Sequence, residues 1–188
     1  MKKITKIFLS AAIIFSLFFI SWTAVRIVKA VTFEFECEAY IKRATNASTV
    51  EMAKTELAKA IEYAERNNLT EGIVSIFLKN PRNDISFWYN NMTAAYNELD
   101  ALPEDSTPLE KTNVLMKLRE SLADNSGDGG ATVLLPAGIS IYPDNVLYFW
   151  WCMISLFGLG VFWSLFAVSL YNHKHRSKNI TGIFDGRK

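Results

Sequence analysis

Histidine, cysteine, glycine and proline are scarce in this sequence, and their scarcity limits the catalytic sites, disulfides and helix breaks that the chain can form. The chain has two histidines, two cysteines, nine glycines and five prolines among 188 residues. Both histidines, His173 and His175, lie near the C-terminus, so the central region cannot assemble a Ser-His-Asp triad or a Cys-His pair. No glycine precedes Gly72 and no proline precedes Pro81, so nothing forces an early helix to end.

The two cysteines, Cys37 and Cys152, provide no disulfide framework. Cys37 is expected a few helical turns outside a membrane and Cys152 inside one, whereas a disulfide needs Cα atoms within about 7 Å of each other. We therefore expect the central region to be held together by packing alone.

Charged side chains are missing from two long stretches. Residues 146–171 contain none, and as a helix they would cover about 39 Å, more than the hydrocarbon core of about 30 Å. Residues 7–25 are also uncharged and follow the basic start MKKITK. We interpret residues 7–28 and 146–171 as transmembrane helices. The alternative for the first is a signal peptide cleaved at Val28-Lys29-Ala30, although its apolar run exceeds the usual length of about 7–15 residues.

Aromatic and basic residues flank these stretches where a bilayer interface would place them. The predicted membrane-interface residues are Trp22, Trp150, Trp151, Tyr171, Lys174 and Arg176. The segment 173–176 (HKHR) could instead bind a metal or sense pH, since histidine titrates near neutrality. A basic cluster that faces anionic lipid is the commoner role of such a segment, and we prefer it.

Charge is divided unevenly along the chain, although the formal net charge is only +1. Residues 1–25 and 146–188 carry eight basic residues against one acidic residue, whereas residues 26–145 carry 12 basic residues against 18 acidic ones. The positive-inside rule places the basic ends, residues 1–6 and 172–188, in the cytoplasm and exports the middle. This pattern predicts a lipid bilayer as the main surroundings and no nucleic-acid partner.

The exported region, residues 29–145, shows helical periodicity from its start. Phe33, Cys37 and Ala44 share one face, so the first helix is expected to continue as a stalk to about Ala44. The alternation FEFECE at residues 33–38 leaves a strand as the alternative.

A second helix is predicted from a capping box of Ser48 and Glu51 to about Asn67. Its apolar seam begins at Val50, and Glu56 falls outside that seam.

Two further helices follow. Asp84 is expected to cap a helix over residues 85–102, and Thr107 with Glu110 forms a capping box for another that runs to about Asp124.

Four shorter segments complete the exported region. Residues 73–78 (IVSIFL) are apolar on both faces and fit a buried strand or a buried helical turn. Residues 125–130 (NSGDGG) are expected to form a flexible loop, and residues 132–135 and 139–142 form either a small β-hairpin or an extended cover. The expected fold class is mainly α, a two-helix transmembrane hairpin that carries a helical exported domain.

Three segments of the exported domain resemble a family of small, uncharacterised bacterial two-span membrane proteins. They are residues 49–72 (TVEMAKTELAKAIEYAERNNLTEG), 84–92 (DISFWYNNM) and 106–120 (STPLEKTNVLMKLRE). The resemblance implies a bacterial origin and a location in the inner membrane. It supplies no catalytic residue, because that family has no assigned activity.

Candidate chemistry is weak. Glu34, Cys37 and Glu38 could bind a metal with a third element, but without histidine a solvated stalk face is the better interpretation. Residues 87–89 (FWY) could stack on a ligand, although aromatic residues at helical spacing usually belong to a core. The glycines of 127–130 lack the Gly-Lys-Ser/Thr ending that would hold phosphates. We predict no catalytic residue, no cofactor and no metal, and therefore no enzyme.

Small residues four positions apart occur in both apolar stretches, Ala12 with Ser16 and Gly160 with Ser164. This spacing lets transmembrane helices approach closely. The pair at 160 and 164 contacts either the chain's own first span or a partner. Neither stretch holds an acidic, basic or histidine side chain inside the expected bilayer core, which argues against transport by this chain alone.

These features predict a non-enzymatic interaction or scaffold subunit of a larger inner-membrane complex. It would dock on another membrane protein or a second copy of the chain through its spans, its helix seams or both. The alternative is an exported sensor that signals through a partner, since about 17 residues after the second span are too few for an output domain.

Overall fold

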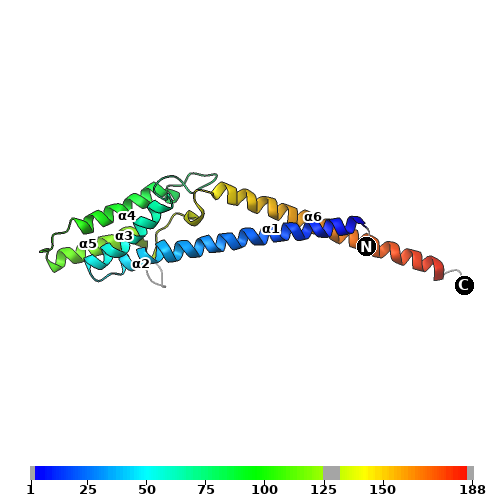
Figure 1. The fold of residues 1–188 in the computed structure, drawn as a ribbon, viewed down its shortest axis with the longest axis horizontal. Coiled ribbons are helices and arrows are strands. Elements are labelled where there is room, and N and C mark those ends of the chain that lie inside the picture. The colour runs from blue at the N-terminus through cyan, green and yellow to red at the C-terminus, as the bar shows by residue number, and fades with distance from the viewer. Residues whose placement is uncertain (1–2, 125–131, 186–188) are drawn as a thin grey trace. The chain divides into compact units, whose positions relative to one another are not determined.

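A computed structural model describes residues 3–124 and 132–185 of the chain. The loop predicted at residues 125–130 lies outside the described residues. The described chain is mainly helical (Figure 1). It divides into two compact units, one of residues 1–26 with 146–188 and the other of residues 27–145.

The elements follow one another in this order: α1 (Lys3–Phe33), the π-helical turn η1 (Glu34–Glu38), α2 (Ala39–Thr45), α3 (Val50–Arg66), the 3-10 turn η2 (Pro81–Asn83), α4 (Ile85–Asp100), α5 (Pro108–Leu122), β1 (Ala123–Asp124), β2 (Thr132–Val133), the 3-10 turn η3 (Ile139–Ile141) and α6 (Asn145–Asp185).

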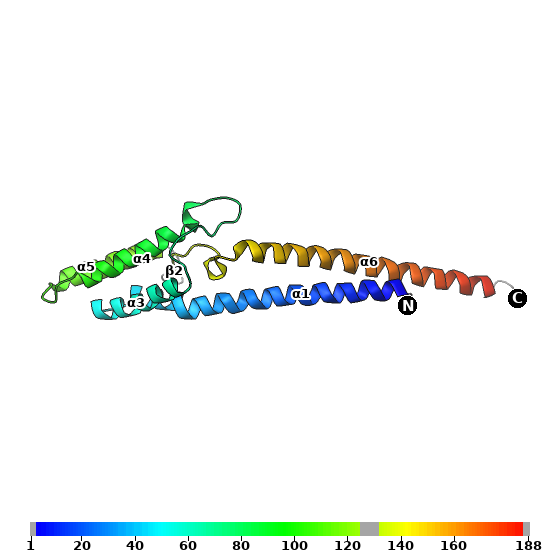
Figure 2. The same cartoon turned by 45° about the horizontal axis from the view of Figure 1, so that its top comes forward.

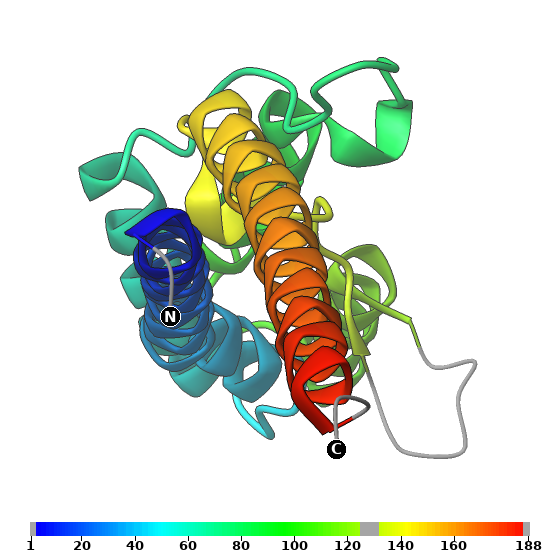
Figure 3. The same cartoon turned by 90° about the vertical axis from the view of Figure 1, so that its right-hand side faces the viewer.

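Two helical stretches of the described chain, Lys3–Thr45 and Asn145–Lys174, are long and apolar enough to cross a membrane. In the first unit the N-terminal part of α1 runs beside α6 (Figures 1 and 3). The helix α6 continues to Asp185, well past the end of the predicted span.

The first helix continues beyond the apolar stretch, as the stalk prediction requires. It runs through η1 and α2 to Thr45. The π-helical turn adds a residue to one turn of the helix and coincides with the FEFECE segment. Phe33 and Cys37 are buried on one side while Phe35 is exposed, so the helical prediction is confirmed and the strand alternative is wrong.

The capping box predicted at Ser48 and Glu51 is wrong by one residue. Thr49 is the N-cap of α3, and its hydroxyl accepts a hydrogen bond from the Met52 N–H at 3.2 Å. Thr49 has the extended backbone that an N-cap requires, and this start buries Val50 against the core.

The predicted end of α3 at Asn67 is confirmed, because Asn67 is the C-cap. The left-handed residue is its neighbour Asn68, with φ of 56°. The N–H of Leu69 donates to the carbonyl of Ala64 at 2.7 Å, and the N–H of Asn68 donates to Glu65 at 3.1 Å. This is a Schellman ending, and Leu69 is buried as the motif expects.

The segment predicted as a buried strand or helical turn is neither. Ile73 forms an isolated antiparallel bridge with Asp84, and Val74 is buried. Beyond them, residues 76–78 are exposed at the surface of an irregular loop. The prediction that residues 76–78 are buried depended on their apolar character alone, and it is wrong.

The caps of α4 and α5 are confirmed. The Asp84 carboxylate accepts from the Phe87 N–H at 3.2 Å. The Thr107 N–H donates to Glu110 at 2.7 Å, and the Glu110 N–H donates to the Thr107 hydroxyl at 3.3 Å, which completes the capping box. Helix α5 ends at Leu122, two residues earlier than predicted, where the chain enters β1.

A small two-stranded antiparallel sheet is present, but its pairing differs from the prediction. Strand β2 pairs with β1, with Ala123 opposite Val133. The predicted pairing of residues 132–135 with 139–142 is wrong, because Gly138 takes a left-handed conformation, φ 87°, and begins the 3-10 turn η3.

The second unit is built around a helical core. Helix α3 packs against α2 and α4, and α5 packs against α4 and α2 (Figures 1 and 2). The largest fully buried apolar side chains of this core are Ile41, Leu57, Ile85, Met92 and Leu122. Burial of each of these side chains contributes about 1.5–3 kcal/mol to the free energy of folding. The apolar seams of these helices thus form the core of the unit itself.

One charged residue of this unit is buried, although the helical pattern placed it at the surface. Glu56 is 8% exposed, and its carboxylate lies 3.1 Å from the Arg43 guanidinium and 3.1 Å from the Lys59 amine. The two cations offset the desolvation of the carboxylate.

Candidate functional site

The predicted packing residues of α1 lie where α1 meets α6. Ala12 is fully buried, and the Ser16 hydroxyl, one turn later, accepts a hydrogen bond from the Trp163 indole N–H at 3.1 Å. The same hydroxyl donates to the Ala12 carbonyl at 2.8 Å. A small residue and a serine at this spacing therefore sit at the contact between the two helices.

The predicted packing residues of α6 lie on another face of that helix. A Cβ atom built at Gly160 would have no described neighbour within 4 Å. Ser164 is exposed, and its hydroxyl donates to the Gly160 carbonyl at 2.7 Å. Gly160 and Ser164 lie in a shallow apolar hollow whose other lining residues are Leu156, Phe157, Val161 and Leu165.

The glycine of α6 that does meet α1 is Gly158. A Cβ atom there would lie 2.2 Å from Cδ1 of Phe15. Phe15 in turn stacks on Phe162, with ring centroids 5.3 Å apart and an interplanar angle of 16°. Positions 148, 151, 155, 158, 162, 166 and 169, each buried or half-buried, follow one another at steps of three or four residues along α6. That spacing is the sequence signal that could have found this face.

Polar side chains fix both ends of the contact between α1 and α6. The hydroxyls of Thr5 and Ser169 are 2.7 Å apart. At the other end the Trp22 indole donates to the Tyr148 carbonyl at 2.8 Å, and a second indole, that of Trp151, donates to the Phe18 carbonyl at 3.2 Å. These bonds satisfy polar groups that would be costly to leave unpaired in an apolar environment.

The predicted interface residues therefore divide into two sets. The indoles of Trp22 and Trp151 donate hydrogen bonds from one helix to the backbone of the other. Trp150, Tyr171 and Lys174 are exposed. Arg176 belongs to α6, but its side chain lies outside the described part of the structure.

The acidic stalk residues do not form a metal site with their neighbours. The Cys37 thiol is buried and points to the Ala60 carbonyl at 3.9 Å. Burial, together with the nearby Glu38 carboxylate, raises the pKa of Cys37 to about 12. Partial burial and the charge of Glu34 raise the pKa of Glu38. Among the described residues no group of three histidine, cysteine or acidic side chains could hold a metal.

A cavity of about 660 Å³ in the second unit lies beside the start of α4. It is lined by Pro81, Arg82, Asp84, Phe87, Trp88, Asn91, Ser121, Leu122, Asp124, Leu134, Leu135 and Pro136. Trp88 is buried, and its indole N–H has no hydrogen-bond partner among the described residues. Tyr89 and Tyr96 do not line this cavity, and the Tyr89 hydroxyl donates instead to Glu65 at 2.7 Å, which raises the pKa of Tyr89.

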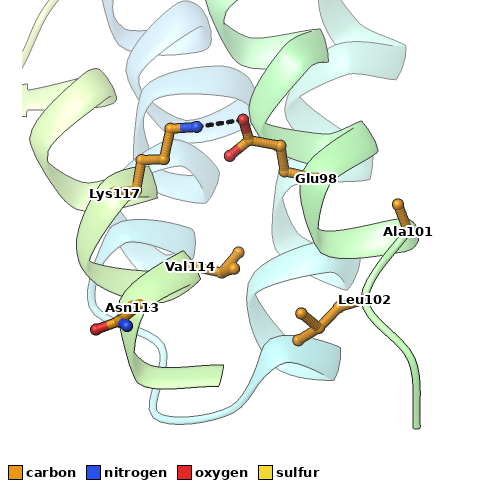
Figure 4. Close-up of a pocket in the computed structure, with 6 residues that line it drawn as sticks. All are labelled: Glu98, Ala101, Leu102, Asn113, Val114 and Lys117. Atoms are coloured by element: carbon orange, nitrogen blue, oxygen red, sulfur yellow. Dashed lines mark hydrogen bonds and ion pairs between the residues drawn. The ribbon is translucent and has the colours of Figure 1, made fainter. Parts of the chain in front are cut away.

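A second hollow, about 390 Å³, lies between the end of α4 and the middle of α5 (Figure 4). Leu102 and Val114 face each other across it, and an ion pair between Glu98 and Lys117 bridges the two helices at one side. The two charged groups that line this hollow are thus paired with each other, which is typical of a structural contact between helices.

No family model, curated protein or solved structure matches the chain. The resemblance to small bacterial membrane proteins therefore stays a prediction, and inferences about function depend on the geometry described above.

Proposed function

We propose that the chain is a non-enzymatic, membrane-anchored interaction or scaffold subunit of a larger bacterial inner-membrane complex. In this proposal α1 and α6 span the membrane, both termini are cytoplasmic and the second unit is exported. The uncharged stretches, the basic ends and the acidic middle of the sequence support this arrangement.

The observation that carries the proposal is the position of Gly160. The apolar seams of α3, α4 and α5 are buried in the core of the second unit, so they offer little surface to a partner. On α6 a Cβ atom at Gly158 would meet Phe15 of α1, whereas a Cβ atom at Gly160 would meet no described neighbour within 4 Å. A glycine and a serine on such a face allow a partner helix to approach closely in lipid, where van der Waals packing drives association.

The test is co-purification of the full-length chain from native membranes in mild detergent. Gly160→Leu adds a side chain to open space, so it should leave the chain intact and abolish recovery of the partner. Val168→Leu, at an exposed position of the same helix, is the matched control and should retain it. Recovery of the same partner in the same amount with Gly160→Leu would refute docking through this face.

The cavity beside α4 favours a second candidate function, that of a sensor. A volume of about 660 Å³ falls in the range of small-molecule sites, and the aromatic residues Phe87 and Trp88 line it. A ligand found by thermal-shift screening of the full-length chain should lose its effect in Leu134→Arg, which fills the cavity. A ligand shift that persists in this variant would exclude the cavity as the sensor site.

A further inference from the structure

The loop that joins α3 to α4 exposes consecutive apolar side chains. Within this α3–α4 loop, defined as residues 73–84, Phe77 is 72% exposed and Leu78 is 82% exposed. No large apolar side chain among the described residues is more exposed than Leu78. Adjacent apolar residues at a projecting tip are typical of an interaction surface.

The charge of this loop is opposite to that of the unit that carries it. Between Gly72 and Asp84 the only charged residues are Lys79 and Arg82, both exposed. The surrounding region is acidic, with 18 acidic residues against 12 basic ones over residues 26–145. Exposed apolar side chains next to basic ones match the surface of a bilayer that contains anionic lipid.

The loop is closed at its base by hydrogen bonds between its two ends. The bridge of Ile73 with Asp84 is extended by a hydrogen bond from the Val74 N–H to the Asn83 carbonyl at 3.0 Å. The Asn83 amide also donates to the Ser75 hydroxyl at 2.6 Å. In Figure 2 the segment between α3 and α4 forms an arc that projects beyond the start of α4.

The base of the loop packs against the segment that leads into α6. A Cβ atom at Gly72 would lie 2.0 Å from the Tyr142 hydroxyl, and one at Gly138 would lie 3.3 Å from a Val74 methyl. The second unit ends at Asn145, only three residues beyond Tyr142. Leu78 is four residues from Val74 and so lies within about 14 Å of it.

The other connection of this unit to an apolar helix lies near the same segment. Lys29, two residues after the unit begins at Ile27, lies 3.8 Å from Asp144 in an ion pair. The α3–α4 loop thus emerges from the end of the unit at which the chain continues into both apolar helices.

We propose that the α3–α4 loop inserts Phe77 and Leu78 into the outer interface of the bilayer that holds α1 and α6, with Lys79 and Arg82 on anionic headgroups. This inference rests on the proposed membrane anchorage and does not depend on the proposed scaffold role. The loop adds a third contact with lipid and thereby limits the tilt of the exported unit.

The test uses the full-length chain in vesicles of phosphatidylethanolamine and phosphatidylglycerol, with a fluorescent label at Leu78→Cys in a Cys152→Ala background. Cys37 stays unlabelled because its thiol is buried and protonated. Nitroxide-bearing lipids quench labels that contact the bilayer. The matched negative control is Leu109→Cys, which is 70% exposed at the start of α5. The length of α4, about 24 Å, separates the two sites along the unit.

We expect shallow nitroxide lipids to quench the label at Leu78 and to leave the label at Leu109 bright. Lys79→Glu and Arg82→Glu should each lower the equilibrium constant for insertion of the loop, by about fivefold for each positive charge removed. Equal exposure of the Leu78 and Leu109 labels to an aqueous quencher would overturn the proposal. Protection of the Leu78 label only after addition of membrane proteins would also overturn it in favour of a protein partner.

A positive control separates this inference from the anchorage on which it rests. A label at Phe157→Cys, at a position 74% exposed on α6, should be quenched by deep nitroxide lipids if that helix spans the bilayer. Quenching at Phe157 without quenching at Leu78 would refute only the loop contact. A label at Phe157 that no lipid quenches would refute the anchorage and the loop contact together.

Discussion

Substitution of Gly158 tests the contact between α1 and α6 most directly. The Cβ atom of any other residue would lie between 2.2 and 2.5 Å from three ring atoms of Phe15, so that ring must leave its stack on Phe162. Overpacking costs about 1–3 kcal/mol, and loss of the aromatic pair adds about 0.5–1.5 kcal/mol. Because each 1.4 kcal/mol corresponds to a factor of ten, Gly158→Leu should open the contact at least tenfold more often.

Disulfide formation between Thr5→Cys and Ser169→Cys measures this opening, since the native hydroxyls are 2.7 Å apart. In a Cys152→Ala background, Gly158→Leu should slow disulfide formation, because the contact that brings the two thiols together is open more often. The matched control is Gly160→Leu, which meets no described neighbour and should leave the rate unchanged. Equal rates for the two glycine variants would show that the two helices do not meet at Gly158.

Three further predictions concern the second unit. Iodoacetamide at pH 8 should not alkylate Cys37 in the folded protein, as measured by mass spectrometry. The pKa of Cys37 is about 12 in the folded protein, above the value of 9.0 for a free thiol, so unfolding above pH 9 releases a proton from this thiol. The free energy of unfolding should therefore fall as the pH rises above 9. Thr107→Ala should lower the free energy of unfolding by about 1 kcal/mol, as measured by thermal denaturation. The Thr107 N–H lowers the pKa of Glu110 from its ordinary value of 4.5. The Glu110 carboxylate therefore stabilises the fold above pH 4.5, and this stabilisation is lost as the pH falls below that value. Glu56→Gln should lower the free energy of unfolding by about 1–3 kcal/mol in urea titrations, because it breaks a buried carboxylate's contacts with two cations. Alkylation of Cys37 in the folded protein, an unchanged melting temperature of Thr107→Ala or an unchanged urea midpoint of Glu56→Gln would contradict the respective prediction.

Features that depend on a few adjacent residues could be predicted from the sequence. Asp84 caps α4, and the box of Thr107 with Glu110 caps α5, because each cap needs only a side chain three positions from its partner. The end of α3 near Asn67 was also predictable, because an asparagine tolerates the left-handed conformation of a helix end, although the left-handed residue is Asn68 and not Asn67. The start of α3 was not, since Ser48 and Thr49 are both good caps and burial of the next residue decides between them.

Features that depend on distant residues could not be predicted in the same way. The small-residue rule selects Gly160 because Ser164 lies four positions on, and it passes over Gly158, whose neighbour four positions on is Phe162. Glycine serves at 158 because a ring from α1 occupies the space, and the sequence of α6 alone does not contain that ring. Glu56 is buried for a related reason, since Arg43 from α2 reaches its carboxylate.

Under the two proposals above, the hollow around Gly160 and the tip of the α3–α4 loop bind different partners, because their chemistry differs. The hollow around Gly160 is apolar and bordered by large side chains, and it complements the ridge of another apolar helix. The tip of the α3–α4 loop combines two exposed apolar residues with Lys79 and Arg82, and a helix in the hydrocarbon core could not satisfy those charges. Hence Gly160→Leu should abolish partner recovery without changing lipid quenching at Leu78. Conversely, Lys79→Glu should weaken that quenching without releasing the partner, and a variant that altered both readouts would show that the two surfaces act as one.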